Sequence, residues 1–212
     1  MTSVLYNIGM NKVQIYYSKI KSFNSEEFVH IVENLPDVKK NQLMSLRLEK
    51  DRNASLSAYL LLKKALKAID IEISDYEYVI GEKGKPSLFY CPYQFSISHT
   101  DGLCAVAVSI DEVGVDVEKI KPYKLKIERI FTHLDCELID GSEQKDKTFY
   151  QIWTSKEAYV KALGTGLSTP FNSFEVLNLN GKHLVHFEIE DYMLSAYTKA
   201  CSEFDEPKEI IL

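Results

Sequence analysis

The chain has 212 residues and a formal charge of −6, and 45% of its residues are apolar. This composition excludes disordered, collagen-like and low-complexity chains, and no stretch reaches the roughly 20 apolar residues of a membrane span. The negative charge argues against broad nucleic-acid binding, and the first residues lack a secretory signal. We therefore expect a soluble protein with no nucleic-acid or membrane partner.

Four cysteines are scattered along the chain without any C-x-x-C pair: Cys91, Cys104, Cys136 and Cys201. Disulfide frameworks and zinc sites usually show tighter spacing. We therefore expect reduced thiols and a cytoplasmic location.

In the first half of the chain, the apolar pattern predicts strands around one long helical region. Apolar residues alternate across 10–20, which indicates a strand, and they follow a helical period across 41–69, in more than one piece. Three short strands are expected next, at 76–80, 95–98 and 104–110. Gly and Pro residues predict a turn at 81–88, between the first two of these strands.

The second half also mixes strands and helices. Valines alternate with Gly, Asp and Glu across 113–118, which indicates a strand. A helix is expected around 125–131, and a stronger one at 150–163 is stopped by Gly164 and Gly166. The remaining strands are expected at 174–179, 183–189 and 195–201, and the turn Asn180-Gly181 separates the first two.

The two halves differ in charge, with a net +1 over residues 1–110 and −7 over residues 111–212. Each half combines a prominent helix with short strands, and no long linker separates them. We therefore expect two closely packed lobes, 1–110 and 111–212, rather than independent domains. On charge alone, random variation between surfaces is a sufficient explanation of the asymmetry.

Asp116 and Glu118 are two residues apart on the predicted strand 113–118. Both carboxylates therefore point to one face of that strand, about 6.5–7 Å apart along the chain. Neighbouring carboxylates repel each other unless they are exposed, share a proton or bind a cation. Two interpretations stay open at this point: the polar face of a half-exposed strand, and a cation site.

The segment W-T-S-K-E-A-Y-V-K-A-L-G-T-G-L extends from Trp153 to Leu167. On a helix, Trp153, Glu157 and Lys161 fall at i, i+4 and i+8 and line one face. Glu157 has a second interpretation, because Thr154 and Glu157 have the spacing of a capping box at a helix start. Lys161 would then be only the i+4 ion-pair partner of Glu157.

The segment F-S-I-S-H-T places His99 and three hydroxyl residues at the end of a predicted strand. His99 is compatible with a phosphate ligand, a general base or a structural hydrogen-bonding residue. The turn G-K-P holds Lys85 outward, where a lysine is most often simply solvated. The chain contains no phosphate-binding G-x-x-x-x-G-K-[ST] loop, no G-x-G-x-x-G, no G-x-S-x-G and no H-E-x-x-H motif.

Taken in order, the motifs G-K-P, F-S-I-S-H-T, G-V-D-V-E and W-T-S-K-E-A-Y-V-K-A-L-G-T-G-L resemble those of the 4′-phosphopantetheinyl transferases. They span residues 84–167, and the chain is similar in length and layout to the larger, monomeric Sfp-type branch. The resemblance implies an α+β fold of two similar lobes with pseudo-twofold symmetry and an active site in the cleft between them. It also implies transfer of the phosphopantetheine arm of coenzyme A to a serine of an apo acyl or peptidyl carrier protein, with release of adenosine 3′,5′-bisphosphate.

The resemblance implies roles for individual residues. Asp116, Glu118 and Glu157 would be ligands of Mg²⁺, a cation that prefers oxygen ligands. Lys161 would contact the pyrophosphate and help the leaving group, and Lys156 is a second candidate for the same phosphate cluster. The expected contacts with the 3′-phosphate region of coenzyme A are Lys85, Ser98 and His99.

Two positions depart from the family pattern. Asp135 stands where a glutamate is expected to act as the base on the carrier serine, and Glu137 follows two residues on. Ala54 stands where the family often supplies an arginine to the 3′-phosphate, and Arg47 or Arg52 are the candidates to replace it. These departures keep a second class open, a non-catalytic module that binds the coenzyme and docks carriers. A third, a metal-dependent phosphohydrolase, lacks the additional carboxylate or histidine clusters that it would need.

A run of cations follows the predicted metal pair: Lys119, Lys121, Lys124, Lys126 and Arg129. Such a run can steer an acidic carrier helix towards the site, although a solvated helix face is the plainer interpretation. These motifs do not indicate whether the carrier serves fatty-acid, polyketide or peptide synthesis.

Overall fold

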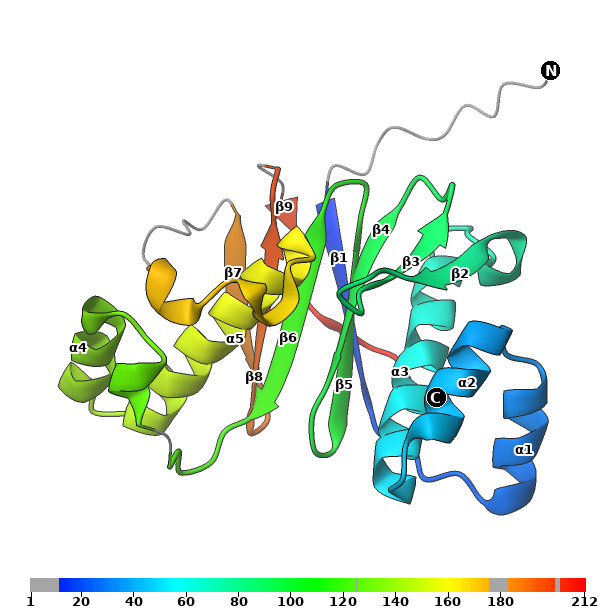
Figure 1. Ribbon diagram of the computed structural model, residues 1–212, viewed down its shortest axis with the longest axis horizontal. Helices are drawn as coiled ribbons and strands as arrows, with labels where there is room; N and C mark the ends of the chain where they lie inside the picture. The colour runs from blue at the N-terminus through cyan, green and yellow to red at the C-terminus, as the bar shows by residue number, and fades with distance from the viewer. Residues whose placement is uncertain (1–11, 125, 176–182, 201–202) are drawn as a thin grey trace.

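The computed structural model shows two β-sheets packed against each other, with helices on their outer sides (Figure 1). It describes residues 12–124, 126–175, 183–200 and 203–212. Two 19-residue helices, α3 (Glu49–Lys67) and α5 (Lys145–Leu163), cover one sheet each. The two halves therefore repeat one plan, a mainly antiparallel sheet with a long helix, and the fold is the expected α+β arrangement of two lobes.

The first sheet is built mainly by the first half of the chain. Its strands follow the order β10-β1-β5-β4, and β9 also pairs with β1. The bounds of these strands are β1 (Lys12–Lys19), β4 (Gln94–His99), β5 (Leu103–Ser109), β9 (Glu203–Phe204) and β10 (Lys208–Glu209). A separate hairpin pairs β2 (Glu77–Ile80) with β3 (Pro86–Phe89). Because β9 and β10 pair with β1, the last residues of the chain return to the sheet of the first half.

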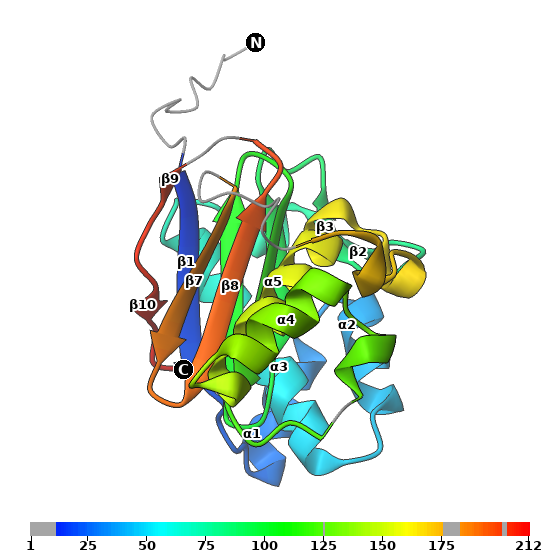
Figure 2. The ribbon, with the colours of Figure 1, turned by 90° about the vertical axis from the view of Figure 1, so that its left-hand side faces the viewer.

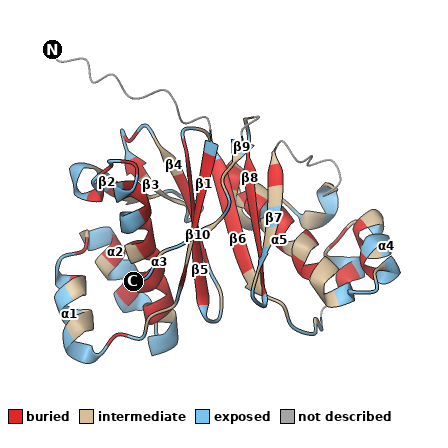
Figure 3. Ribbon diagram, turned by 180° about the vertical axis from the view of Figure 1, so that it is seen from behind, coloured by how far each residue is buried: buried red, intermediate tan, exposed pale blue. Residues whose placement is uncertain are grey.

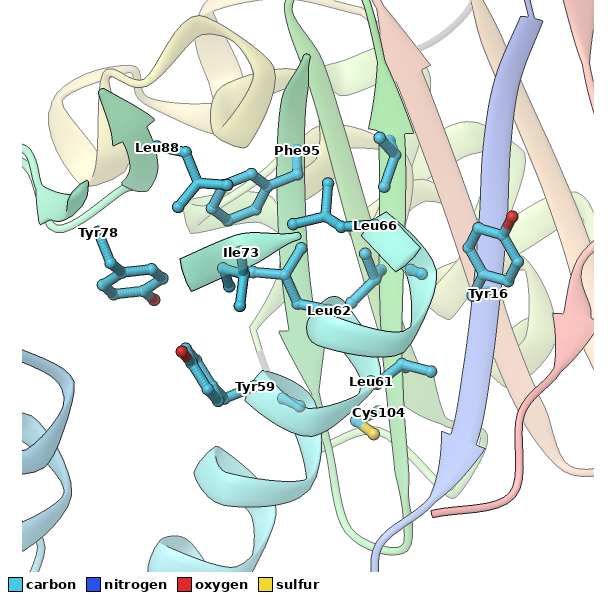
Figure 4. Packing of buried hydrophobic residues seen from close by; sticks show 14 of the residues in the cluster. Tyr16, Tyr59, Leu61, Leu62, Leu66, Ile73, Tyr78, Leu88, Phe95 and Cys104 are labelled. Atoms are coloured by element: carbon cyan, nitrogen blue, oxygen red, sulfur yellow. The ribbon is translucent and has the colours of Figure 1, made fainter. Parts of the chain in front are cut away.

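Helix α3 covers the outer face of this sheet. It follows α1 (Ser25–Glu33) and α2 (Asp37–Ser45), of which α2 contacts α3 and β2, and a short 3-10 turn η1 (Ile73–Asp75) comes after it. Helix α3 has no Gly or Pro, and Leu62 and Leu66 recur at helical spacing on its buried face. Figure 4 shows these two leucines against Phe95 of β4. The side of α3 that faces the sheet is buried along almost its whole length, as the red colour in Figure 3 shows.

The second sheet has the order β6-β8-β7, with β6 (Val113–Lys119), β7 (Leu184–Ile189) and β8 (Tyr192–Thr198). Helix α5 lies along one face of this sheet, with α4 (His133–Gly141) beyond it (Figure 2). Three short 3-10 turns complete this half: η2 (Ile127–Arg129), η3 (Gly166–Ser168) and η4 (Phe171–Ser173).

A hydrophobic cluster joins the two sheets. It contains Ile15 of β1 and Ala105 of β5 on one side, and Val115 of β6 and Leu194 of β8 on the other. At the edge, the hydroxyl of Ser96 on β4 accepts a hydrogen bond of 3.0 Å from the Val115 amide of β6. The cluster and this bond hold β4 and β6 side by side, and these two strands carry four of the expected site residues: Ser98, His99, Asp116 and Glu118.

Most of the predicted elements are confirmed, within a few residues at their ends. The expected helix around 125–131 is wrong: the described residues there form only the turn η2, and the helix α4 begins at His133, where Thr132 supplies a capping box with Asp135. The predicted turn 81–88 is shorter than expected, because Pro86 already begins β3. Helix α1 and the strands β9 and β10 were not predicted.

Some predictions lie outside the described residues. They are most of the expected strand 174–179, the turn Asn180-Gly181 and Cys201. The other three cysteines are free thiols. Among the described helices, none has both the length and the apolar character that crossing a lipid bilayer requires.

Candidate active site

The strands β4 and β6 and the helix α5 bring three predicted site residues into one hydrogen-bonded group. The Asp116 carboxylate oxygen Oδ1 lies 2.6 Å from the Lys161 ammonium and accepts a 2.7 Å hydrogen bond from the Ser98 hydroxyl. Lys161 also donates to the Ser98 oxygen at 2.9 Å. Ser98 belongs to the first half, and Asp116 and Lys161 to the second, so the group spans the junction between the lobes.

Gly114 explains how α5 approaches β6 closely enough to form this group. A Cβ atom at position 114 would lie 1.9 Å from the backbone oxygen of Ala158 and 2.6 Å from the backbone nitrogen of Ala162. Only glycine therefore fits beneath the helix here. This close contact brings Glu157 and Lys161, on the same turns of α5, over Asp116.

Glu118 and Glu157 carry the same negative charge as Asp116, and the three carboxylates interact with one another electrostatically. Burial raises the pKa of Glu157, and the charges of Asp116 and Glu118 raise it further against the opposing effect of Lys161. Burial likewise raises the pKa of Glu118, although the Thr100 hydroxyl donates a 2.8 Å hydrogen bond to it. Among the atoms of the described residues, Asp116 Oδ2 is buried without a hydrogen-bond partner.

These features fit a cation bound between the carboxylates. In the described part of the chain, no three His, Cys, Asp or Glu side chains are already arranged as a metal-binding group. The unpartnered Asp116 oxygen and the mutual repulsion of the carboxylates are nevertheless what a bound divalent cation would relieve. The donor set is all oxygen, as Mg²⁺ prefers.

The capping-box interpretation of Glu157 is wrong. Helix α5 begins at Lys145, so Thr154 and Glu157 lie in its middle. The Thr154 hydroxyl is 2.8 Å from the Tyr150 carbonyl oxygen and 2.7 Å from the Ser195 hydroxyl on β8. It therefore anchors the helix to the second sheet rather than capping it.

The expected face of Trp153, Glu157 and Lys161 is only partly realised. Glu157 and Lys161 line a cavity of about 250 Å³, but Trp153 is not part of its lining. The Trp153 ring instead packs against three aromatic rings: Phe131, Phe149 and Phe171. Trp153 is a core residue of the second lobe.

The cavity beside Glu157 collects motifs that are far apart in the sequence. Its walls come from the G-K-P turn, from β4 and from the end of α5, including Lys85, Ile97 and Gly164. Gly164 ends α5 with a left-handed φ of 66°, a conformation that glycine adopts without strain. The Lys85 ammonium donates to the carbonyl oxygens of Val113 at 3.1 Å and Ala162 at 3.2 Å, which fixes the turn against β6 and α5.

Lys39 of α2 is a buried cation that the sequence pattern did not single out. It is only 5% exposed, and among the described residues its ammonium contacts an amide and a hydroxyl oxygen rather than a carboxylate. Its ammonium donates to Gln42 at 2.9 Å and to the Ser55 hydroxyl at 2.8 Å, and burial lowers its pKa to about 8. The only sequence signal was a lysine on the apolar side of a helix, which is too common to single out.

His99 is exposed at the end of β4. Partial desolvation lowers its pKa, and the positive charges of Lys161 and Lys39 lower it further. The charge of Asp51 acts in the opposite direction and raises the pKa of His99. Arg52 is committed elsewhere, because it donates to the Leu46 and Arg47 carbonyl oxygens at 2.8 and 3.1 Å, and Arg47 is exposed at the end of α2.

Asp135 and Lys156 contact each other and do not line the cavity beside Glu157. Both are buried, with exposed fractions of 1% and 0%, and they form an ion pair of 2.7 Å. Asp135 also accepts hydrogen bonds from the amide and the hydroxyl of Thr132. A carboxylate in this position cannot meet a carrier serine, and the buried ammonium cannot meet a phosphate, so the structure argues against a base at Asp135 and a phosphate ligand at Lys156.

Comparison with known proteins agrees with the geometry. Residues 112–205 match the family model of the 4′-phosphopantetheinyl transferase superfamily. The 4′-phosphopantetheinyl transferase gsp of Aneurinibacillus migulanus is 34% identical over 129 residues, which are 59% of this chain and 54% of that protein. The 4′-phosphopantetheinyl transferase Sfp of Bacillus subtilis strain 168 is 28% identical over 186 residues, 84% of this chain and 82% of that protein.

A further 4′-phosphopantetheinyl transferase of Bacillus subtilis is 30% identical over 148 residues, 68% of this chain and 66% of that protein. The alignment with gsp thus spans about half of that relative, whereas the alignment with Sfp spans most of both chains. The chain therefore belongs to the 4′-phosphopantetheinyl transferase superfamily and is an enzyme of its Sfp type.

Proposed function

We propose that the chain transfers the 4′-phosphopantetheine arm of coenzyme A to a serine hydroxyl of an apo acyl or peptidyl carrier protein, with adenosine 3′,5′-bisphosphate as the second product. The observation that carries the proposal is the convergence of Asp116, Glu118, Glu157 and Lys161 between the two lobes. Phosphoryl transfer needs positioned positive charge around the phosphates more than covalent chemistry. The names of the relatives support the same reaction.

The reaction is proposed to require Mg²⁺, with Asp116, Glu118 and Glu157 as the protein ligands. The buried, unpartnered Oδ2 atom of Asp116 supports this assignment. When bound, Mg²⁺ would supply positive charge to the pyrophosphate oxygens. The three side chains come from β6 and α5, which their contact at Gly114 holds in fixed relative positions.

Lys161 is proposed to bind the pyrophosphate and to stabilise the leaving group. A lysine ammonium has three N–H donors, and Lys161 uses two of them on Asp116 and Ser98. The third is available to a phosphate oxygen. Ser98 and Asp116 therefore orient the Lys161 ammonium and leave one N–H donor for a phosphate oxygen.

The 3′-phosphate of coenzyme A is proposed to lie near Lys39 and His99. Lys39 also has one of its three donors left, because Gln42 and Ser55 take the other two. A buried ammonium without a carboxylate partner is costly, and a bound phosphate would neutralise it. Neither Arg47 nor Arg52 is then needed for this role. Lys85 keeps one donor as well, but its main role here is to hold the G-K-P turn.

The carrier protein is proposed to dock beside the metal carboxylates. In the cation run after β6, Lys119 pairs with Asp191, whereas three exposed lysines make no ion pair among the described residues: Lys121, Lys124 and Lys126. Lys121 lines a hollow of about 580 Å³ together with the rings of Tyr123 and Phe149. Cations around an aromatic floor suit an acidic helix that also presents an apolar side chain.

We also propose that the chain acts as a cytoplasmic monomer with lobes 1–110 and 111–212. One chain supplies both sides of the cleft, so a second copy is not required to complete the site. The free thiols of Cys91, Cys104 and Cys136 suit a reducing compartment. The return of β9 and β10 to β1 amends the second boundary, since these strands belong structurally to the first lobe.

The proposed reaction is tested with coenzyme A, Mg²⁺ and a panel of apo carriers from fatty-acid, polyketide and peptide synthesis. Intact mass spectrometry should show at least one carrier gaining a phosphopantetheine arm, and none gaining it when EDTA replaces Mg²⁺. Coenzyme A binding by calorimetry without any mass gain would instead favour the non-catalytic module. Hydrolysis of coenzyme A without a carrier would favour the phosphohydrolase.

A further inference from the structure

Lys156 uses every donor that it has. Its ammonium contacts the Asp135 carboxylate at 2.7 Å, the Phe171 carbonyl oxygen at 2.9 Å and the Phe174 carbonyl oxygen. A lysine has three N–H donors, so none remains for a ligand. The Phe174 ring lies 4.3 Å from the ammonium and closes the site on one side.

These contacts join three separate pieces of the chain. Asp135 belongs to the first turn of α4, and Lys156 belongs to the middle of α5. Phe171 and Phe174 lie at the end of the segment 164–174, whose first residues Gly164 and Gly166 line the cavity beside Glu157. Lys156 therefore holds the far end of the same segment that forms one wall of the cavity.

Stability alone does not explain a charged pair in this place. Removing two charges from water costs several kcal/mol per ion, and apolar residues of similar volume are often equally stabilising. An apolar side chain, however, cannot fix two backbone carbonyl oxygens in direction. The Lys156 ammonium does fix them, and the Asp135 carboxylate neutralises this ammonium and orients it towards the two carbonyl oxygens.

We propose that Lys156, oriented by Asp135, is a positioning residue that fixes the segment 164–174 against α5 and so sets the shape of the coenzyme A cavity. The proposal rests on the proposed function, since it takes coenzyme A as the ligand of that cavity. Lys156 touches neither the coenzyme nor the carrier. It acts through Gly164 and Gly166, which line the cavity beside Lys83 and Lys85 of the turn that contains G-K-P.

The test separates positioning from simple stabilisation. Lys156→Met leaves Asp135 buried without its partner and should lower the urea midpoint of unfolding. The double variant D135L/K156M removes both charges and should recover most of that midpoint, while its affinity for coenzyme A, measured by calorimetry with Mg²⁺ present, stays at least about tenfold weaker than that of the parent. In transfer assays KM for coenzyme A should rise, with kcat at saturation changing less than about threefold.

The matched control is Lys147→Met, which changes a half-buried lysine of the same helix that pairs with Glu188. It should alter neither affinity nor stability appreciably. If D135L/K156M regains both the midpoint and the parental affinity, the pair is merely structural and the proposal is overturned. Coenzyme A binding without transfer in the parent would contradict the proposed function but leave this inference intact.

If D135L/K156M does not fold, the milder variant Asp135→Asn tests the positioning role of Lys156 instead. Its backbone amides at 165–174 should exchange with solvent hydrogen at least about tenfold faster than in the parent, while those of α3 stay unchanged. Its affinity for coenzyme A should fall with that change. Unchanged exchange in this segment, or faster exchange with unchanged affinity, would overturn the proposal.

Discussion

The contact between Gly114 and α5 gives the sharpest prediction for a single substitution. In Gly114→Ala, the new Cβ would lie 1.9 Å from the backbone oxygen of Ala158 and 2.6 Å from the backbone nitrogen of Ala162. Both atoms belong to the backbone of α5, which cannot rotate away as a side chain can. To restore an ordinary contact distance of 3.4 Å, the helix must retreat by about 1.5 Å. The contact between Lys161 and Asp116 is only 2.6 Å long, so a retreat of this size breaks it.

Gly114→Ala should therefore lower kcat/KM for phosphopantetheine transfer by about 100-fold or more, because misplacements of this size in a catalytic group have effects of that order. The unfolding free energy should fall by about 1–3 kcal/mol from overpacking. Steady-state transfer and urea unfolding measure the two effects. The matched control is Gly141→Ala, where a Cβ would meet nothing within 4 Å. Transfer by Gly114→Ala within threefold of the parent would refute the reasoning.

Three further predictions concern Lys39 and the carrier. Lys39→Met should weaken binding of coenzyme A about 10- to 100-fold and leave binding of dephospho-coenzyme A nearly unchanged, as calorimetry can show; equal losses for both ligands would remove Lys39 from the 3′-phosphate site. Burial lowers the pKa of Lys39 from the ordinary 10.5 to about 8 in the folded chain. Between these two pH values the lysine is protonated in the unfolded chain and neutral in the folded chain, so stability rises with pH. The parent should therefore gain about 3 kcal/mol of stability relative to Lys39→Met as the pH rises through this range, and a constant difference between the two proteins would contradict it. The double charge reversal K121E/K124E should raise KM for an acidic carrier several-fold at low salt and flatten its salt dependence, whereas K63E/K67E, on the outer face of α3, should change neither.

The fold followed from the sequence wherever one pattern dominated. The alternation of Val113, Val115 and Val117 predicted β6, and the helical period before Ile69 predicted α2 and α3. The helix predicted at 125–131 was wrong for a local reason, since Ile127–Arg129 form a 3-10 turn and the next helix begins only after the Thr132 cap. The strands β9 and β10 are two residues long and depend wholly on pairing with β1, which no local pattern can reveal.

The sequence predicted the site residues that stand in motifs. It did not predict the role of a residue whose contacts come from distant parts of the chain. Asp116 and Lys161 stand in motifs, and the structure brings them together. Lys156 looked like a phosphate ligand because it adjoins Glu157. Successive helix residues point about 100° apart, so Glu157 faces the cavity while Lys156 faces α4. Lys39 could not be singled out, because its burial depends on Ser55 and Tyr59 of another helix.

The central claim is that the carboxylate and lysine group between β4, β6 and α5 is the catalytic centre. The most direct measurement is the initial rate of holo-carrier formation by Glu157→Gln, set against Glu188→Gln, which changes an exposed carboxylate on β7. We predict that Glu157→Gln loses at least about 1,000-fold in rate while its urea midpoint stays close to that of the parent, and that Glu188→Gln keeps the parental rate. A folded Glu157→Gln protein with near-parental turnover would contradict the account.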